Sequence, residues 1–193
     1  MNNRNLILPT TKQLEQELQR EKYNFRYKKL LKNGFYILLL VVAISTLIAT
    51  FLFPVLQIYG QSMEPTLSED DIVVSLKSSS YKKGDVIAFY YNNRILVKRV
   101  IATSSEWINI DEDGNVFVND KLVNEPYIIK KALGKSDLDF PYQVPEGTYF
   151  VLGDERTTSI DSRNSLIGTI SSEEIIGKLI FKVWPINKFA LIN

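Results

Sequence analysis

The longest uncharged run in the chain extends from Asn33 to Met63. Its core, GFYILLLVVAISTLIATFLFPVL over residues 34–56, is almost wholly apolar. As an α-helix that rises about 1.5 Å per residue, this core reaches roughly 34 Å, which is enough to cross a hydrocarbon layer of about 30 Å. The run predicts one transmembrane helix over 34–56, which Pro54 should end or kink near its far side.

Two other structures also produce an apolar run near an N-terminus. A cleaved secretory signal has a basic start and an apolar centre, but this run is longer, begins farther from Met1 and is followed by no clear Ala-x-Ala site. A buried helix of a globular domain is the second alternative. The length and the missing charges favour the transmembrane helix over both.

The charges on either side of the run differ in sign. Residues 1–33 carry eight Lys or Arg against three Glu, and the first charges after the run are Glu64 and Glu69. Because cytoplasmic flanks are rich in Lys and Arg, we expect the 1–33 tail in the cytoplasm and residues 57–193 outside. The helix-forming tail either lies on anionic lipid or only sets the topology.

The sequence of residues 57–193 predicts a mainly antiparallel β domain. Turn sequences such as KKGD, YNNR and DEDGN separate short runs that are rich in β-branched and aromatic residues, as hairpins require. A long loop is expected over 130–145. The predicted strands are DIVVSLK, DVIAFYY, RILVKRVIA, WINI, NVFVND, KLV, TYFVLGD and KLIFKVW.

The chain contains neither cysteine nor histidine. It therefore has no disulfide and no thiol nucleophile, and it lacks histidine, the commonest general base. Ser62 lies in GQSMEPTL, in a turn just beyond the apolar run, and Gly60 permits close approach of a ligand's backbone. A serine in a turn is ordinary, so a reactive Ser62 needs a base other than histidine.

Lys98 is a candidate for that base, because it lies in the aliphatic strand RILVKRVIA beside Arg99. Burial would disfavour its ammonium form and lower its pKa, so that the neutral amine could accept a proton. The alternative is an edge strand whose long side chains reach solvent.

A third polar stretch, LGDERTTSIDSR over 152–163, follows the strand TYFV. Asp154 and Glu155 could suggest a metal site or a paired-carboxylate site. Arg156 and Arg163 are close enough in sequence to neutralise them, which favours a structural ion-paired loop.

These three stretches together resemble the type I signal peptidases of the Gram-positive kind, which are membrane-anchored serine proteases with a Ser-Lys dyad. SMEPTL, KRVIA and GDERTTSIDSR match three family boxes in order, although Glu155, Thr157 and Thr158 depart from the third. The resemblance covers about residues 36–185 and implies an antiparallel β catalytic domain. It identifies Ser62 as the nucleophile and Lys98 as the general base.

The resemblance also implies supporting roles. Ser159 matches the serine that orients the lysine amine, Asp161 and Arg163 match a salt-bridged pair, and Asp154 and Arg99 match further supports of the site. Gly60 stands where some Gram-negative members have a serine that donates to the oxyanion.

The function implied is removal of signal peptides from secreted preproteins with small residues at −1 and −3, at the cell membrane. It implies no cofactor, no metal and no nucleic-acid partner, and the sequence defines no oligomeric state. One alternative is a peptidase dedicated to particular surface proteins or pili. Another is a non-catalytic assembly protein, although both dyad residues are present here.

Overall fold

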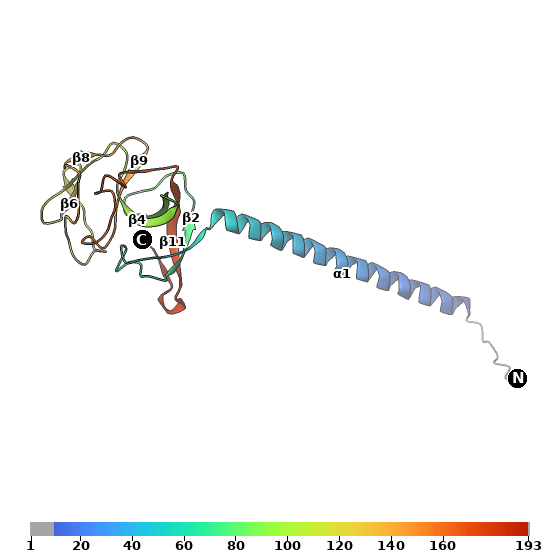
Figure 1. Ribbon diagram of the computed structural model, residues 1–193. Helices are drawn as coiled ribbons and strands as arrows, with labels where there is room; N and C mark the ends of the chain where they lie inside the picture. The colour runs from blue at the N-terminus through green and yellow to red at the C-terminus, as the bar shows by residue number, and fades with distance from the viewer. Residues whose placement is uncertain (1–9, 193) are drawn as a thin grey trace. The chain divides into compact units, whose positions relative to one another are not determined.

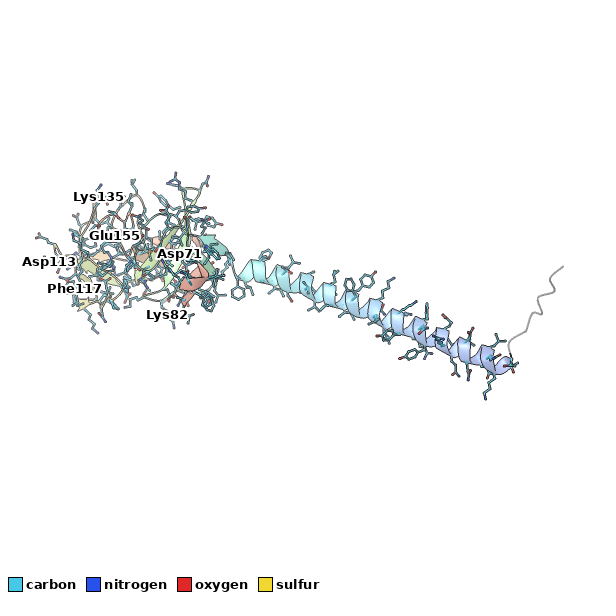
Figure 2. The ribbon with its side chains drawn as sticks, turned by 90° about the horizontal axis from the view of Figure 1, so that it is seen from below. Asp71, Lys82, Asp113, Phe117, Lys135 and Glu155 are labelled. Carbon is cyan, nitrogen blue, oxygen red and sulfur yellow. The ribbon has the colours of Figure 1, made fainter. Side chains whose placement is uncertain are left out.

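The computed structural model describes residues 10–192, which divide between Thr50 and Phe51 into a helical unit and a β-rich unit (Figure 1). The helical unit holds α1 (Thr11–Leu52) except for the last two residues of that helix, and all side chains of α1 are exposed (Figure 2). By length and composition α1 can cross a membrane. Residues 1–9 of the predicted tail lie outside the described residues, and the helix-forming part of the tail is helical as expected.

The helix ends two residues before Pro54, and Val55 and Leu56 already belong to the first strand. The span expected over 34–56 therefore extends past the end of α1. Proline has no N–H with which to continue the helix, and the residue before it is biased toward an extended backbone.

Within residues 51–192 the structure has twelve strands and one 3₁₀ helix, η1 (Ile186–Lys188). All eight predicted strands are present, and β1, β8, β10 and β12 were not predicted. The strands are β1 (Val55–Gln57), β2 (Ile72–Leu76), β3 (Val86–Tyr91), β4 (Arg94–Ala102), β5 (Trp107–Ile110), β6 (Val116–Val118), β7 (Lys121–Leu122), β8 (Tyr142–Gln143), β9 (Thr148–Leu152), β10 (Ile170–Ser171), β11 (Ile175–Trp184) and β12 (Ala190–Leu191).

The strands form two antiparallel sheets. The larger has the order β1-β2-β11-β3-β4-β9-β10, with β12 paired to β11, and the smaller has the order β7-β6-β5-β8. Figure 1 shows β6 and β8 of the smaller sheet to one side of β4 and β11. The predicted loop over 130–145 is irregular except for the two residues of β8.

Strand β4 is paired unevenly, and this shapes the molecule's surface. Its residues 94–99 pair with β3, but its other edge pairs with β9 only from Arg99 onward. Residues 94–98 therefore present one open edge. At one end of the same sheet, β1 pairs only with β2.

One hydrophobic cluster joins the segment after β1 to the sheet. Met63 and Leu67 are fully buried in this cluster together with Val73, Val86 and Leu179. The large apolar side chains of Met63 and Leu67 thus anchor the Ser62 segment to β2, β3 and β11.

Candidate active site

Ser62 lies in a loop that connects β1 with β2 and is closed at its base by backbone hydrogen bonds. The Ile58 N–H donates to the Asp71 carbonyl over 2.9 Å, and the Asp70 N–H donates to the Ile58 carbonyl over 3.0 Å. Buried Met63 and Leu67 fix the interior of the loop. Ser62 itself remains half-buried at the surface.

Lys98 projects from the middle of β4, where its backbone pairs with Ile87 of β3. Its side chain is buried, with 3% of the residue exposed, so the solvent-reaching alternative is wrong. Lys98 Nζ lies 2.6 Å from Ser62 Oγ. The structure therefore brings together the two residues that the sequence singled out, 36 positions apart.

Burial lowers the pKa of the Lys98 ammonium from 10.5 to about 8. The Asp161 carboxylate opposes this shift, Arg163 adds to it, and Asp154 opposes it more weakly. Loss of hydration is the largest cause, and it makes the neutral amine far more abundant near physiological pH than in an ordinary lysine, although the ammonium remains the major form. A neutral amine at hydrogen-bond distance can accept a hydroxyl proton.

Arg99, the next residue on β4, makes a buried bidentate ion pair with Asp154. Its Nε lies 2.9 Å from Asp154 Oδ1 and its Nη2 lies 2.7 Å from Oδ2. The guanidinium also stacks on the Tyr127 ring, with 3.9 Å from Cζ to the ring centroid. Asp154 thus pairs with Arg99, and the expectation that Arg156 or Arg163 neutralises it is wrong.

Asp161 and Arg163 form a second buried bidentate pair, as the resemblance implied, with both contacts at 2.8 Å. Asp161 Oδ2 also accepts the Gly153 N–H over 2.9 Å. Arg156 instead pairs with Glu125, far away in sequence. The polar stretch over 152–163 is therefore an ion-paired loop, but two of its pairs reach to other parts of the chain.

Ser159 is buried near these residues, yet its Oγ has no hydrogen-bond partner within residues 10–192. The contact with the lysine amine that the resemblance implied is thus not formed in this structure. Ser159 Oγ and the Ser62 carbonyl both lie beside Gly153, so close that a Cβ on Gly153 would be 2.1 Å and 2.6 Å from them. Ser159 therefore adjoins the Ser62 segment.

The backbone around Ser62 has a free donor. Among the described residues no acceptor takes the Ser62 N–H, whereas the Ser62 carbonyl accepts the Glu155 N–H over 3.1 Å. Gly60, at φ +80°, has no heavy atom within 4 Å of the place where a Cβ would stand. The Ser62 N–H is therefore available to a ligand, and there is open space at Gly60, two residues earlier.

A groove of about 640 Å³ opens on Ser62 and Lys98. Its two walls are the segment from β1 to Tyr59 and the open edge of β4. The lining residues are Val55, Leu56, Gln57, Ile58, Tyr59, Ser62, Met63, Asn93, Arg94, Ile95, Leu96, Val97 and Lys98. Two strand edges with unpaired backbone groups thus face one largely apolar groove.

Four residues in this network were missed by reasoning from the sequence. Thr66 donates to Asp154, Glu125 pairs with Arg156, Tyr127 stacks on Arg99, and Lys182 donates to the Thr66 carbonyl. The sequence shows Thr66 four residues after Ser62, but it does not show that Thr66 is hydrogen-bonded to Asp154. The other three lie in segments whose sequence gave no indication of a role in the site. Within residues 10–192 no group of three or more Asp or Glu side chains lies close enough together to hold a metal ion.

Comparison with known proteins shows the family of this chain. The family model described as signal peptidase, peptidase S26, matches residues 30–184. Signal peptidase I of Bacillus amyloliquefaciens is 35% identical over 162 residues, which cover 78% of this chain and 86% of that protein. Signal peptidase I T of Bacillus subtilis (strain 168) is 34% identical over 164 residues, which cover 78% and 84%.

Among solved structures, a signal peptidase I from Enterococcus faecalis V583 aligns with a TM-score of 0.43 at 27% identity, covering 52% of this chain and 97% of that one. The family match extends over most of the chain, from the apolar part of α1 to the end of β11. The chain therefore belongs to the signal peptidase family, peptidase S26.

Proposed function

We propose that this chain is a membrane-bound serine endopeptidase that removes N-terminal signal peptides from secreted preproteins, with Ser62 as nucleophile and Lys98 as general base. The observation that carries the proposal is the 2.6 Å separation of Ser62 Oγ and Lys98 Nζ in a site where burial lowers the lysine pKa. Family membership supports the class of reaction.

In the first step Ser62 Oγ attacks the carbonyl carbon of residue −1, and Lys98 Nζ accepts the hydroxyl proton. The resulting ammonium then gives that proton to the amine of the leaving mature protein. Water attacks the ester that remains on Ser62, again with proton transfer to Lys98. Return of the proton to Ser62 Oγ regenerates both groups.

The developing oxyanion needs a donor close to Ser62. The free backbone N–H of Ser62 is the candidate donor to the oxyanion, because Gly60 has no side chain that could donate. Arg99, Asp154, Asp161 and Arg163 act as supports, since their ion pairs hold the loop beside the base. We assign Ser159 to orienting Lys98, which requires its side chain to reach the amine when substrate is bound.

The substrate would enter the groove as an extended strand. The open edge of β4 and the edge of β1 offer unpaired backbone groups for strand addition, and shallow pockets would accept small side chains at −1 and −3. Apolar lining residues such as Met63 and Leu96 suit alanine-sized groups.

The apolar part of α1 would anchor the enzyme in the cell membrane. The basic flank supports a cytoplasmic N-terminus and a β-rich unit outside the cytoplasm. A signal peptide that leaves the bilayer would then meet Ser62, which follows the end of α1 by ten residues.

The test is cleavage of a preprotein by the detergent-solubilised full-length chain. We expect Ser62→Ala and Lys98→Ala to abolish cleavage, and the control Ser172→Ala, an exposed serine in the turn after β10 and outside the groove, to keep it. Retained cleavage by either dyad variant would refute the mechanism. A non-catalytic assembly protein would instead show no cleavage in the unmodified chain.

A further inference from the structure

The side chain of Arg94 places a positive charge in the groove, four residues before Lys98 on β4. Arg94 is the first residue of β4, directly after a tight turn in which Asn92 and Asn93 both have positive φ, at 44° and 60°. Asparagine tolerates this left-handed conformation, so the turn fixes where β4 begins. Arg94 therefore lines the groove from a defined position, four residues before Lys98.

The guanidinium of Arg94 is not neutralised by the protein. Arg94 is exposed, and within the described residues it has neither an ion pair nor a hydrogen bond from its side chain. The groove contains no carboxylate, since its remaining lining residues are apolar or uncharged apart from Lys98. A substrate in the groove would thus meet one uncompensated positive charge at Arg94.

The strand geometry relates Arg94 to a particular substrate position. Alternate residues of a strand share a face, so Arg94, Leu96 and Lys98 lie on one side of β4. In a peptide added to the open edge, residues −1, −3 and −5 likewise share a face. The open edge ends at Lys98, because β9 covers β4 from Arg99 onward, so a peptide with −1 opposite Lys98 can extend along this edge only if it runs parallel to β4. In that orientation −5 lies opposite Arg94, about 13 Å along the strand at roughly 3.3 Å per residue.

We propose that Arg94 is a specificity-determining residue that reads the charge of the substrate side chain at −5, favouring an acidic group and disfavouring Lys or Arg. Neighbouring strands lie about 4.8 Å apart, so side chains on the same face of the two strands can touch, and opposite charges there attract. The inference rests on the proposed function, because it needs the scissile bond to lie at Ser62.

The experiment uses three preproteins that are identical except for Asp, Asn or Lys at −5, with Ala at −1 and −3. Each is cleaved at low salt by the full-length chain in detergent. We expect kcat/KM to fall from Asp to Asn to Lys by about threefold at each step, the size of one exposed charge pair. The differences should shrink at high salt.

Charge reversal is the decisive arm. Arg94→Glu should invert the order, Arg94→Gln should flatten it, and Lys121→Glu should leave it unchanged, since Lys121 is equally exposed but lies in β7 of the other sheet. Lys121→Glu should cleave the Asn substrate at the unmodified rate, and each Arg94 variant is judged by the ratios of its own rates on the Asp, Asn and Lys substrates. An unmodified enzyme that ignores the charge at −5, or an Arg94→Glu variant that keeps the order, overturns the proposal.

Two further arms separate other causes. The same charges placed at −4 should have a smaller effect, because that side chain faces the opposite way; an equal effect at both positions would indicate a long-range field and would overturn the pairing. Repeating the assay in vesicles with and without anionic lipid tests for a headgroup partner. If Arg94→Glu changes all three rates equally, and only on anionic vesicles, the partner is lipid and the proposal is wrong.

Failure of the proposed function has a different signature. If Ser62→Ala still cleaves the Asn substrate, the nucleophile assignment is wrong whatever the charge order. If Ser62→Ala is inactive but the unmodified enzyme shows no charge order, only the role of Arg94 is lost.

Discussion

Thr66 Oγ1 donates a hydrogen bond of 2.5 Å to Asp154 Oδ2. That carboxylate is also held by the Arg99 guanidinium, whose Nη2 lies 3.3 Å from the same hydroxyl. Since Thr66 follows Ser62 by four residues and Arg99 is adjacent to Lys98, one hydroxyl connects the two segments that carry the proposed dyad.

We expect Thr66→Val to lower kcat about tenfold with little change in KM, because a lost buried hydrogen bond of about 1–2 kcal/mol loosens the Ser62 segment relative to Lys98. Thr66→Ser keeps the hydroxyl and should restore most of the rate. Steady-state cleavage of a preprotein measures both. A near-normal kcat in Thr66→Val would show that this hydrogen bond does not align the site.

The rate of cleavage should depend on pH through Lys98. Its pKa is lowered to about 8, so kcat/KM should rise tenfold per pH unit below that value and level off above it. A pH–rate profile from 6 to 10 measures this directly. A flat profile, or a midpoint near 10.5, would contradict a buried amine base.

The same shift affects stability. In the pH range between about 8 and 10.5 the unfolded chain binds the proton that folded Lys98 has lost, so this group makes the fold more stable as pH rises. Below pH 8 the full cost of burying the ammonium is present. We therefore expect Lys98→Met to raise the free energy of unfolding by about 2 kcal/mol at pH 7, with a smaller gain at pH 10.

Thermal or urea unfolding of the Lys98→Met variant at both pH values measures this gain. The exposed Lys121→Met is the matched control, and it should change stability little at either pH. A destabilised Lys98→Met variant at pH 7 would mean that the contact with Ser62 outweighs the burial cost.

Much of the fold was predictable because its signals are local. The strand DVIAFYY and the turn YNNR that follows it carry their own alternation and turn chemistry, and both appear as expected in β3 and the β3–β4 turn. The strands β10 and β12 have only two residues each, too few for a pattern, and they exist because a longer neighbour supplies the hydrogen bonds.

The candidate site was predictable as residue types but not as contacts. Lys98 stood out because a cation among aliphatic residues is unusual, and its burial agrees with that interpretation. The partner of Asp154 was predicted wrongly, because proximity in sequence favoured Arg156 whereas the sheet places Arg99 opposite, through the pairing of Arg99 with Leu152. The register in which two distant strands pair cannot be read from the sequence of either strand alone.

Gly153 offers the sharpest steric test of the site. A Cβ there would stand 2.6 Å from the Ser62 carbonyl oxygen, a backbone atom, and 2.1 Å from Ser159 Oγ. Rotation can move the Ser159 hydroxyl but not the Ser159 Cβ, which is also 2.6 Å from the added atom. Relief therefore needs a shift of the main chain, which moves Ser62 relative to Lys98. Displacement of a reacting group by about 1 Å can cost roughly a hundredfold in rate.

We therefore expect Gly153→Ala to lower kcat by about a hundredfold while the β-rich unit stays folded, as circular dichroism would report. Gly34→Ala is the matched control, because no heavy atom lies within 4 Å of a Cβ at that position. Near-normal activity in Gly153→Ala would mean that the Ser62 segment moves without losing its alignment with Lys98. In that case the close approach of Gly153 would serve packing alone, and the alignment would depend on the Thr66 and Asp154 contact instead.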